Sequence, residues 1–534
     1  GVIAAGAILV GALAVGDSVR ESLKLKARER TGPVSLAILG GDRFFRNGLL
    51  QGPDTAPLLQ LLGTANRQDG EARVNQVQVL GADPRFWTFW GGSTPRGVPT
   101  RGQVALSAAL AEALRAKVDD ELILRITKPS ALSRDAVVTP RDDQSVALRL
   151  KVSGILTPTE GDFSLTSGSQ PPMNAWVDQD QLADAVGLPG LANLLLRTAP
   201  GSDLLADEAA ATQALGQAWT LADGGLSLAT IPRAVPSNTV ELATRRIFLE
   251  PPIVQATERV EVPARRIPIL TYLVNGLRHG DRLTPYSMVT AAGAPYTPAD
   301  LQDDKIVVND WLARDLRVKA GDPVEMTYYR VDAGSRLTEH TQTFRVRQVV
   351  PMEGVHADRT LMPEFPGLSK AESTRDWDAG FELVHTIRDE DETYWKQWRG
   401  TPKAFVSLRT GQRLWANRFG DLTAVRWIPD DGVATPTVVE GLTRDLNQRL
   451  LKPGDVGLVW RSIGVAAQRG ATGGQDFGGL FIGFSFFLIV SALLLTAMLF
   501  RFALDRRGSE IGILVALGWR IRRVQGLILL EGVV

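Results

Sequence analysis

The chain has 534 residues, and its 59 basic and 59 acidic side chains give a formal net charge of zero. At roughly 150 residues per domain, this length predicts about three domains with sizeable cores. The balanced charge argues against nucleic-acid binding through bulk positive charge, the apolar content of 44% excludes a disordered chain, and the absence of cysteine excludes disulfide scaffolds, thiolate metal sites and cysteine nucleophiles.

The first segment of the chain, residues 1–16, is apolar and carries no charge. It is too short to cross a bilayer alone, and it lacks the positive n-region and small-residue cleavage site of a signal peptide. We therefore expect a partial first transmembrane helix in a fragment of a longer membrane protein. Residues 17–32 are polar with no helix breaker before Gly32-Pro33, which predicts a stalk helix.

The middle of the chain contains an internal repeat. Residues 103–124 and 305–326 align without a gap at an offset of 202, and six positions are identical in the two copies. The identical pairs are Leu110 and Leu312, Ala111 and Ala313, Leu114 and Leu316, Arg115 and Arg317, Lys117 and Lys319, and Asp120 and Asp322.

Each copy predicts a strand, a short helix, a turn and a second strand. The first strands are expected at 104–106 and 306–308, and Ser107 and Asn309 suit the helix N-cap. Further β-type runs follow at 146–156 and 343–350. We expect apolar positions to face a core in both helices, at 110, 114 and 118 and at 312, 316 and 318. These patterns predict two similar α+β modules, at 33–240 and 241–460.

Two patterns resemble catalytic or metal-binding sites and are better explained otherwise. Gly16-Asp17-Ser18 follows an apolar run, as the nucleophile of some esterases does, but none of the four histidines has an aspartate three residues earlier. The pairs Glu353 with His356 and Glu382 with His385 have carboxylate–imidazole spacing. Because suitable partner glutamates are not evident, we interpret them as surface residues and expect no metal site.

Tryptophans alternate with basic residues between positions 395 and 427, a mixture that can bind nucleic acid. Acidic residues at 389–392 lie beside them. We therefore expect packing or a protein-facing surface rather than nucleic-acid binding. The tryptophans are Trp395, Trp398, Trp415 and Trp427.

Residues 478–500 form an uncharged run of 23 residues. As a helix rising about 1.5 Å per residue, this run is long enough for a hydrocarbon core of about 30 Å, so we expect the second transmembrane helix here. Residues 461–477 are expected to form a stalk that enters it. Six arginines follow this span, whereas seven basic residues lie near the two spans on the other side, so charge alone leaves the orientation open.

The segment after this span has the most specific sequence. Residues 506–524 read RRGSEIGILVALGWRIRRV, and residues 529–532 read LLEG. This segment resembles the FtsX/MacB family of ABC-transporter permeases, in which the cytoplasmic end of the second span turns into a short coupling helix with the pattern EIGxLxALG. Residues 16–23 are similar to the exit of the family's first span. The repeated element is similar to family periplasmic domains, with Asp119 in place of an expected glycine.

The resemblance implies an α+β extracytoplasmic domain of two similar modules, flanked by transmembrane α-helices in a bacterial cytoplasmic membrane. Residues 501–534 would form a cytoplasmic coupling segment and the start of a third span. An amphipathic helix with flanking arginines suits binding in a protein groove, and it also suits an anionic lipid surface. The residues assigned to ATPase coupling are Arg507, Glu510, Ile511, Leu514, Ala516, Leu517 and Gly518.

The sequence departs from the family in the large size of its outer region and in the absence of a third and fourth span. It contains no GxxxxGK[ST] phosphate loop, so the resemblance implies a separate ATPase subunit, with no cofactor and no catalytic residue in this chain. Implied partners are this ATPase, membrane lipid, a second permease copy and an envelope protein or lipoprotein. A membrane-anchored binding or sensor protein is the alternative, and a membrane-tethered hydrolase has no supporting constellation.

Overall fold

A computed structural model describes residues 2–91, 97–129, 145–165, 170–198, 204–331, 337–365, 367–369, 371–378, 383–463 and 477–533. The chain divides into two compact units. One unit contains the helices of the two chain ends, and the other contains the sheets from Pro33 to Asp162 and from Pro172 to Ser462.

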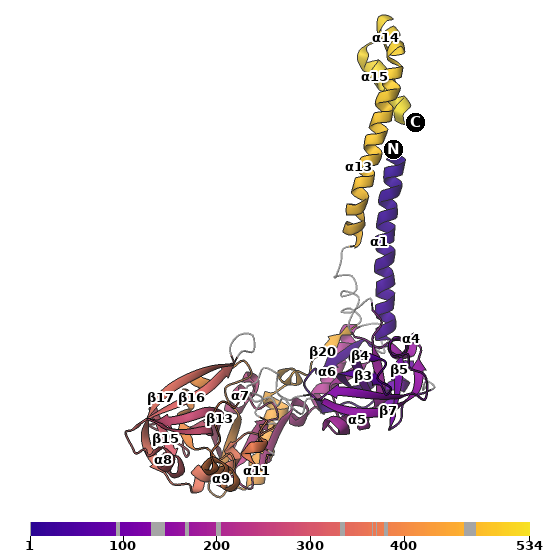
Figure 1. The fold of residues 1–534 in the computed structure, drawn as a ribbon. Coiled ribbons are helices and arrows are strands. Elements are labelled where there is room, and N and C mark those ends of the chain that lie inside the picture. The colour runs from indigo at the N-terminus through magenta and orange to yellow at the C-terminus, as the bar shows by residue number, and fades with distance from the viewer. Residues whose placement is uncertain are drawn as a thin grey trace. The chain divides into compact units, whose positions relative to one another are not determined.

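The helical unit contains α1 (Val2–Thr31) and α13 (Phe477–Arg506), which lie side by side (Figure 1). Two short helices follow α13, namely α14 (Gly508–Ala516) and α15 (Ile521–Val533). The predicted span at 1–16 and stalk at 17–32 are thus parts of one continuous helix. The predicted stalk at 461–477 is different, because Arg461 and Ser462 belong to a strand and residues 464–476 lie outside the described ranges.

The first sheet has nine strands in the order β20-β1-β10-β3-β4-β8-β5-β7-β6, with an additional pairing between β3 and β6. This pairing closes the strands from β3 to β6 in that order into a barrel. The strands are β1 (Leu36–Leu39), β3 (Thr55–Arg67), β4 (Arg73–Ala82), β5 (Gln103–Ser107), β6 (Glu121–Thr127), β7 (Ser145–Leu156), β8 (Asn174–Asp178), β10 (Leu194–Arg197) and β20 (Trp460–Ser462).

The second sheet repeats this topology strand for strand, in the order β11-β12-β19-β13-β14-β18-β15-β17-β16, and a pairing between β13 and β16 closes its barrel. A mixed α/β fold of two similar sheet modules is therefore present. The strands are β11 (Leu226–Thr230), β12 (Val240–Thr244), β13 (Ala264–His279), β14 (Arg282–Ala292), β15 (Lys305–Asn309), β16 (Pro323–Val331), β17 (Leu337–Val350), β18 (Ala404–Val406) and β19 (Ala424–Pro429).

Short helices and a small sheet complete the modules. The small sheet pairs β2 (Phe45–Arg46) with β9 (Leu191–Ala192). The helices are α2 (Pro84–Gly91), α3 (Ala108–Leu114), α4 (Pro158–Gly161), α5 (Gln179–Val186), α6 (Leu204–Ala218), α7 (Pro251–Glu258), α8 (Asp310–Leu316), α9 (Asp389–Trp398), α10 (Leu408–Trp415) and α11 (Thr435–Arg444). A π-helical turn at Asp445–Leu450 follows α11, and short 3-10 turns lie at Leu221–Gly224, Gly354–Ala357, Arg359–Leu361, Thr374–Asp376 and Pro453–Val456.

The repeated sequence element folds in the same way in both modules, as predicted. The Ser107 side chain accepts a hydrogen bond from the Leu110 N–H (3.4 Å), and the Asn309 side chain accepts one from the Leu312 N–H (2.8 Å), so both predicted N-caps are confirmed. A register shift occurs after Val104 when β5 pairs with β7, and the same shift occurs after the equivalent Ile306 when β15 pairs with β17. The duplication therefore extends to irregularities of the backbone.

One predicted core position is wrong. Val118 is about half exposed, whereas Ala116, which aligns with the buried Val318, is itself buried. The cause is the end of helix α3 at Arg115, which adopts the left-handed conformation. Helical spacing does not continue past that residue, so it cannot predict the orientation of Val118.

The two modules exchange their final strands. A helix, a turn and a strand follow the barrel of each module, as α6 to β11 after the first and as α11 to β20 after the second. Strand β11 pairs with β12 of the second sheet, and β20 pairs with β1 of the first. The boundary between the two sheets therefore differs from the module boundary at residue 240 that the sequence predicts. Strand β11 lies within residues 33–240 but belongs to the second sheet.

An ionic cluster joins the segment that directly follows β1 to the segment that directly follows β12. Arg43 donates to the Glu250 carboxylate (2.7 Å) and to the Val456 carbonyl (2.9 Å). Arg246 lies 3.3 Å from Asp42 and 3.7 Å from Glu250. Arg43 and Glu250 are partly buried, so solvent screens their ion pair less than a surface pair, whereas Asp42 is about half exposed.

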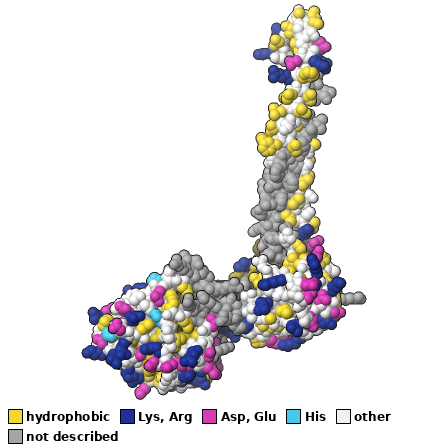
Figure 2. Space-filling view, in the orientation of Figure 1, with side chains coloured by type: hydrophobic (Ala, Val, Ile, Leu, Met, Phe, Trp, Pro, Cys, Tyr) yellow, Lys and Arg dark blue, Asp and Glu magenta, His cyan; other side chains and the backbone are white. Residues whose placement is uncertain are grey.

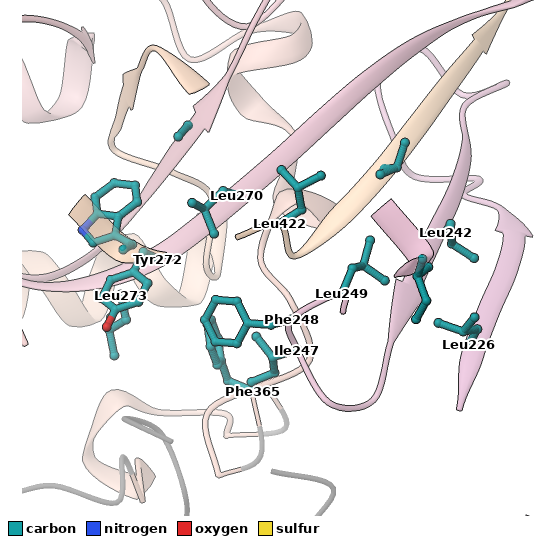
Figure 3. Close-up of a cluster of buried hydrophobic side chains, with 14 of the residues drawn as sticks. Leu226, Leu242, Ile247, Phe248, Leu249, Leu270, Tyr272, Leu273, Phe365 and Leu422 are labelled. Atoms are coloured by element: carbon teal, nitrogen blue, oxygen red, sulfur yellow. The ribbon is translucent and has the colours of Figure 1, made fainter. Parts of the chain in front are cut away.

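One hydrophobic core includes residues from both modules. Leu36 and Ile38 of β1 and Trp460 of β20 belong to the same buried cluster as the interior of the second barrel. Figure 3 shows the part of this cluster in which Leu226 and Leu242 of the paired strands β11 and β12 lie near Leu249. Burial of apolar area at about 25 cal/mol per Å² makes this continuous core a major contribution to the stability of the paired modules.

Candidate functional site

Among the described helices, one is long and apolar enough to cross a membrane: the part of α13 from Phe486 to Arg506, which has 21 residues. No part of it is buried inside the protein, unlike the core helix of a soluble domain. At 1.5 Å per residue it extends about 32 Å, which matches the hydrocarbon thickness of a bilayer. Figure 2 shows apolar side chains along this helix and basic side chains toward α14 and α15.

The described residues of α1 do not meet the length and hydropathy requirements that α13 meets. Its described apolar side chains near the start, such as Val10 and Leu13, are exposed. Ser18, the candidate esterase nucleophile, lies within the continuous helix and is also exposed. The sharp strand-to-helix turn that presents such a nucleophile is therefore absent at this position.

Helix α14 is separated from its neighbours by two backbone breaks. Arg507 departs from helical geometry at the end of α13 and caps the start of α14, where it lies 3.7 Å from Glu510. Gly518 ends α14 with a left-handed backbone (φ 87°), and the Trp519 N–H donates to the Leu514 carbonyl. Arg507 and Gly518 thus set the bounds of a helix of nine residues.

The structure divides the predicted coupling residues between two faces of α14. Ile511 and Leu514 are half-buried, whereas Arg507, Glu510, Ala516, Leu517 and Gly518 are exposed. Leu517 is 73% exposed, and Ile513, four residues earlier on the same face, is 60% exposed. Sequence reasoning missed Ile513, although its i, i+4 spacing from Leu517 could have indicated the shared face.

Basic side chains surround this exposed apolar face. The arginines at 501, 506, 507, 520, 522 and 523 are all exposed, whereas Asp505 and Glu510 are the acidic side chains described there. An apolar stripe with a basic rim can bind in a protein groove or lie on an anionic surface.

The two ends of the sheet unit lie together in one ladder. Leu36 pairs with Ser462, Ala37 with Arg461 and Ile38 with Trp460 in the antiparallel pair of β1 and β20. We call this pair the β1–β20 clasp. The chain enters the sheets through β1 and leaves them through β20, so the connections to α1 and to α13 begin at neighbouring backbone positions.

His356 and the tryptophans, among the remaining sequence candidates, have structural roles. His356 lies in a 3-10 turn with its Nε2 atom 3.1 Å from the Tyr296 carbonyl, and burial lowers its pKa. Glu382 lies outside the described ranges, and no group of three metal-ligating side chains occurs among the described residues. Trp395, Trp415 and Trp427 are buried, which confirms packing for these three side chains, and Trp398 is partly buried.

No family model matches the sequence, and no curated protein matches it. Several solved structures show partial likeness, and two of them are described here. The periplasmic region of MacB from Actinobacillus actinomycetemcomitans is 10% identical, and the match covers 36% of this chain and 86% of that chain with a TM-score of 0.24. A domain of a putative permease from Porphyromonas gingivalis is 12% identical, with 37% and 88% covered and a TM-score of 0.22.

At TM-scores this low, the likeness carries no inference about the fold of this chain. The duplicated architecture instead rests on the strand order and register of the two sheets themselves.

Proposed function

We propose that the chain is the permease subunit of an ABC transporter of the mechanotransmission type in a bacterial cytoplasmic membrane. The observation that carries this proposal is the direct continuation of an unburied apolar helix, α13, into a short helix whose apolar side chains are exposed. That short helix has the sequence pattern of a coupling helix. Leu517 and Ile513 would enter a groove of a cytoplasmic ATPase, with the surrounding arginines at its rim.

In this proposal the sheet unit lies outside the cytoplasm and receives movement through the chain. ATP-driven closure of the ATPase moves α14, and α13 transmits this movement to its connection with β20. The β1–β20 clasp joins that connection to the start of β1, so movement of one membrane helix relative to the other acts on one short ladder. The result is export of a lipoprotein, lipid or drug, or activation of an envelope partner, and a homodimer or paired permease completes the transporter.

Isolation of the complex tests the proposal. The chain is purified in detergent from its native membrane, and the proteins that accompany it are identified by mass spectrometry. We expect a P-loop ATPase to accompany the native chain. Leu517→Asp should remove it, because a charge would be desolvated in the groove. Ser509→Asp is the matched control, because it adds the same charge at an exposed polar position of the first turn, where a carboxylate is favourable.

Two results contradict the proposal. Absence of an ATPase from the native complex would favour the membrane-anchored sensor or binding protein. Retention of the ATPase by Leu517→Asp would remove α14 from the contact.

A further inference from the structure

The second sheet ends at β11, and the outer edge of this strand carries free backbone groups. The Ile231 N–H donates to the Thr239 carbonyl (2.9 Å), and the Arg245 N–H donates to the Gly225 carbonyl (3.4 Å). Hydrogen-bonded positions alternate in an antiparallel pair, so the odd-numbered residues of β11 bond to β12 and the even-numbered residues bond outward. The outward residues are Leu226, Leu228 and Thr230. Among the residues that the structure describes, their N–H and C=O groups have no hydrogen-bond partner.

Strand β11 lacks the features that protect most sheet edges. Natural sheets end in very short strands, charged side chains, prolines or bulges, because an open edge pairs readily with another strand. The five residues of β11 read LSLAT, and they pair with β12 without a shift in register. Its exposed side chains, Ser227, Ala229 and Thr230, are small and uncharged. A second strand therefore meets neither bulk nor charge at this edge.

The equivalent strand at the end of the first sheet, β20, is protected. Each of the two strands follows a 3-10 turn and a left-handed glycine, Gly225 before β11 and Gly457 before β20. Counted from these glycines, Ala229 corresponds to Arg461. Strand β20 has three residues, and the exposed Arg461 is the central one. The duplication thus ends one sheet with a short, charged strand and the other with a longer, uncharged strand.

The free edge of β11 is complementary to the same edge of a second copy. In an antiparallel pair centred on Leu228, this residue lies opposite Leu228 of the second copy, and Leu226 lies opposite Thr230. All of these residues bond outward, so each such pair exchanges two hydrogen bonds. Ser227 lies opposite Ala229, and both side chains are small. The edge therefore satisfies itself across a twofold axis, as an isologous contact requires.

The charged side chains around β11 do not oppose this pairing. Glu241 of β12, the partner of Ala229, accepts a hydrogen bond from Arg426 (2.7 Å) on its other side. Arg233 and Arg245 are exposed, but they lie beyond the ends of the paired segment. Neither lies opposite the same residue of a second copy, so the pairing does not bring like charges face to face.

We propose that two copies of the chain pair through their β11 edges and join their second sheets into one continuous sheet. The paired edge is short, so confinement of both copies to one membrane supplies the effective concentration that the contact needs. The inference rests on the proposed function for the presence of two copies in that membrane. It holds or fails independently of the contact between α14 and an ATPase.

Disulfide formation between two differently tagged full-length copies in native membranes tests this register. The native chain has no cysteine, so one copy carries Ser227→Cys and the other carries Ala229→Cys. In the proposed register these positions form a non-hydrogen-bonded pair with Cα atoms about 4.5 Å apart, so oxidation should join the two tags. Either variant expressed alone is the matched control, because its two cysteines lie diagonally, about 8 Å apart, which is too far for a bridge.

A proline at position 230, added to both tagged copies, tests the edge itself. The Thr230 N–H points outward, so Thr230→Pro keeps the ladder with β12 but removes one hydrogen bond from each of the two pairs that Thr230 forms with Leu226. The bridged fraction should fall about fivefold or more, because two hydrogen bonds are lost. Thr230→Ala keeps the N–H and should leave the bridged fraction unchanged.

The proposal is overturned if the mixed copies form no bridge, if either cysteine variant alone bridges equally well, or if Thr230→Pro leaves the bridged fraction unchanged. A bridge from Ser227→Cys to another protein in place of the second copy also overturns it. If Thr230→Pro does not reach the membrane, Thr230→Lys decides, because it places a charge in the edge and keeps the N–H. The bridge needs no ATPase, so its failure leaves the result for Leu517→Asp unaffected.

Discussion

Asp119 and Gly321 occupy the same position in the turns of the two modules. Both have a left-handed backbone, with φ values of 76° and 96°, and both donate their N–H to the neighbouring strand, at Val152 (2.9 Å) and Val346 (2.8 Å). In each turn the next aspartate accepts from the backbone three residues earlier, Asp120 from Lys117 and Asp322 from Lys319. The turn geometry is therefore conserved between the modules although the residue type differs.

This equivalence predicts different effects of substitution in the two turns. Gly321→Ala should lower the free energy of unfolding by about 1 kcal/mol, because alanine is strained at positive φ and no neighbouring atom would contact its Cβ. Asp119→Gly should change stability by less than about 0.5 kcal/mol, because relief of backbone strain is offset by loss of the exposed ion pair with Lys151. Urea unfolding measures both, and an unchanged midpoint for Gly321→Ala would contradict the assigned backbone.

The β1–β20 clasp predicts a disulfide between distant parts of the chain. Ala37 and Arg461 are direct partners, and the native chain has no cysteine, so the double variant Ala37→Cys, Arg461→Cys should form one bridge on oxidation. Its loop of 424 residues (461 − 37) should stabilise the sheets more than a short loop does, by an entropy contribution on the order of 5 kcal/mol. Mobility on a non-reducing gel and urea unfolding measure the bridge and its effect.

A matched control exists in the second module. Ser227 and Ala243 are direct partners in β11 and β12, where a bridge closes a loop of only 16 residues (243 − 227). It should stabilise the protein less, by about 3 kcal/mol. If the control bridge forms and the clasp bridge does not, the pairing of β1 with β20 is wrong.

Lys403 predicts a pH dependence of stability. Its pKa in the folded protein is about 8, below the usual value of about 10.4 for an unfolded chain, because burial outweighs the favourable charges of Asp391 and Asp315. Between these values the unfolded chain binds more protons, so the free energy of unfolding contributed by this group rises as pH increases from about 8 to about 10. Lys403→Met should lack this rise.

Urea unfolding of both proteins at about pH 7 and about pH 9.5 measures the difference. Other groups titrate in both proteins. The change in the free energy of unfolding between the two pH values is therefore compared, and the change for Lys403→Met is subtracted from the change for the native chain. A native chain that gains no stability relative to Lys403→Met over this interval would show that the amine is solvated.

The proposed topology predicts opposite labelling of two cysteines in intact cells. Leu205 is 79% exposed at the start of α6 in the sheet unit, and Ser509 is exposed in α14. Leu205→Cys should react with a membrane-impermeant maleimide, whereas Ser509→Cys should react only after lysis. The absence of native cysteine removes background labelling. Labelling of both positions from outside would contradict a span between them.

Sequence patterns predicted the elements that depend on interactions between residues close together in the chain. The repeated strand and helix were predictable because Ser107 and Asn309 are strong N-caps before apolar positions at helical spacing. The apolar run in α13 was predictable because length and absence of charge suffice. The conformation of Asp119 follows from its alignment with glycine, although sequence reasoning treated it only as a departure from the family pattern.

Long-range pairing could not be predicted in the same way. Strand β20 has three residues, and its partner β1 lies more than 400 positions earlier, so no hydrophobic period of its own identifies it. The pairing of Lys403 with Asp391 depends on how the connection between β17 and β18 folds over β14, which spacing alone does not indicate. The exposed face of α14 similarly depends on the turn at Gly518 and on packing against its neighbours.

The most direct measurement of coupling is photo-cross-linking from α14 in native membranes. A photoreactive phenylalanine analogue is placed at Leu517, in the exposed apolar face, or at Ser509 as the control. Insertion of this face into an ATPase groove predicts a strong adduct from position 517 with a P-loop protein, and a much weaker one from position 509. Adducts with lipid alone at position 517, or equal adducts with the ATPase at both positions, would contradict coupling through this helix.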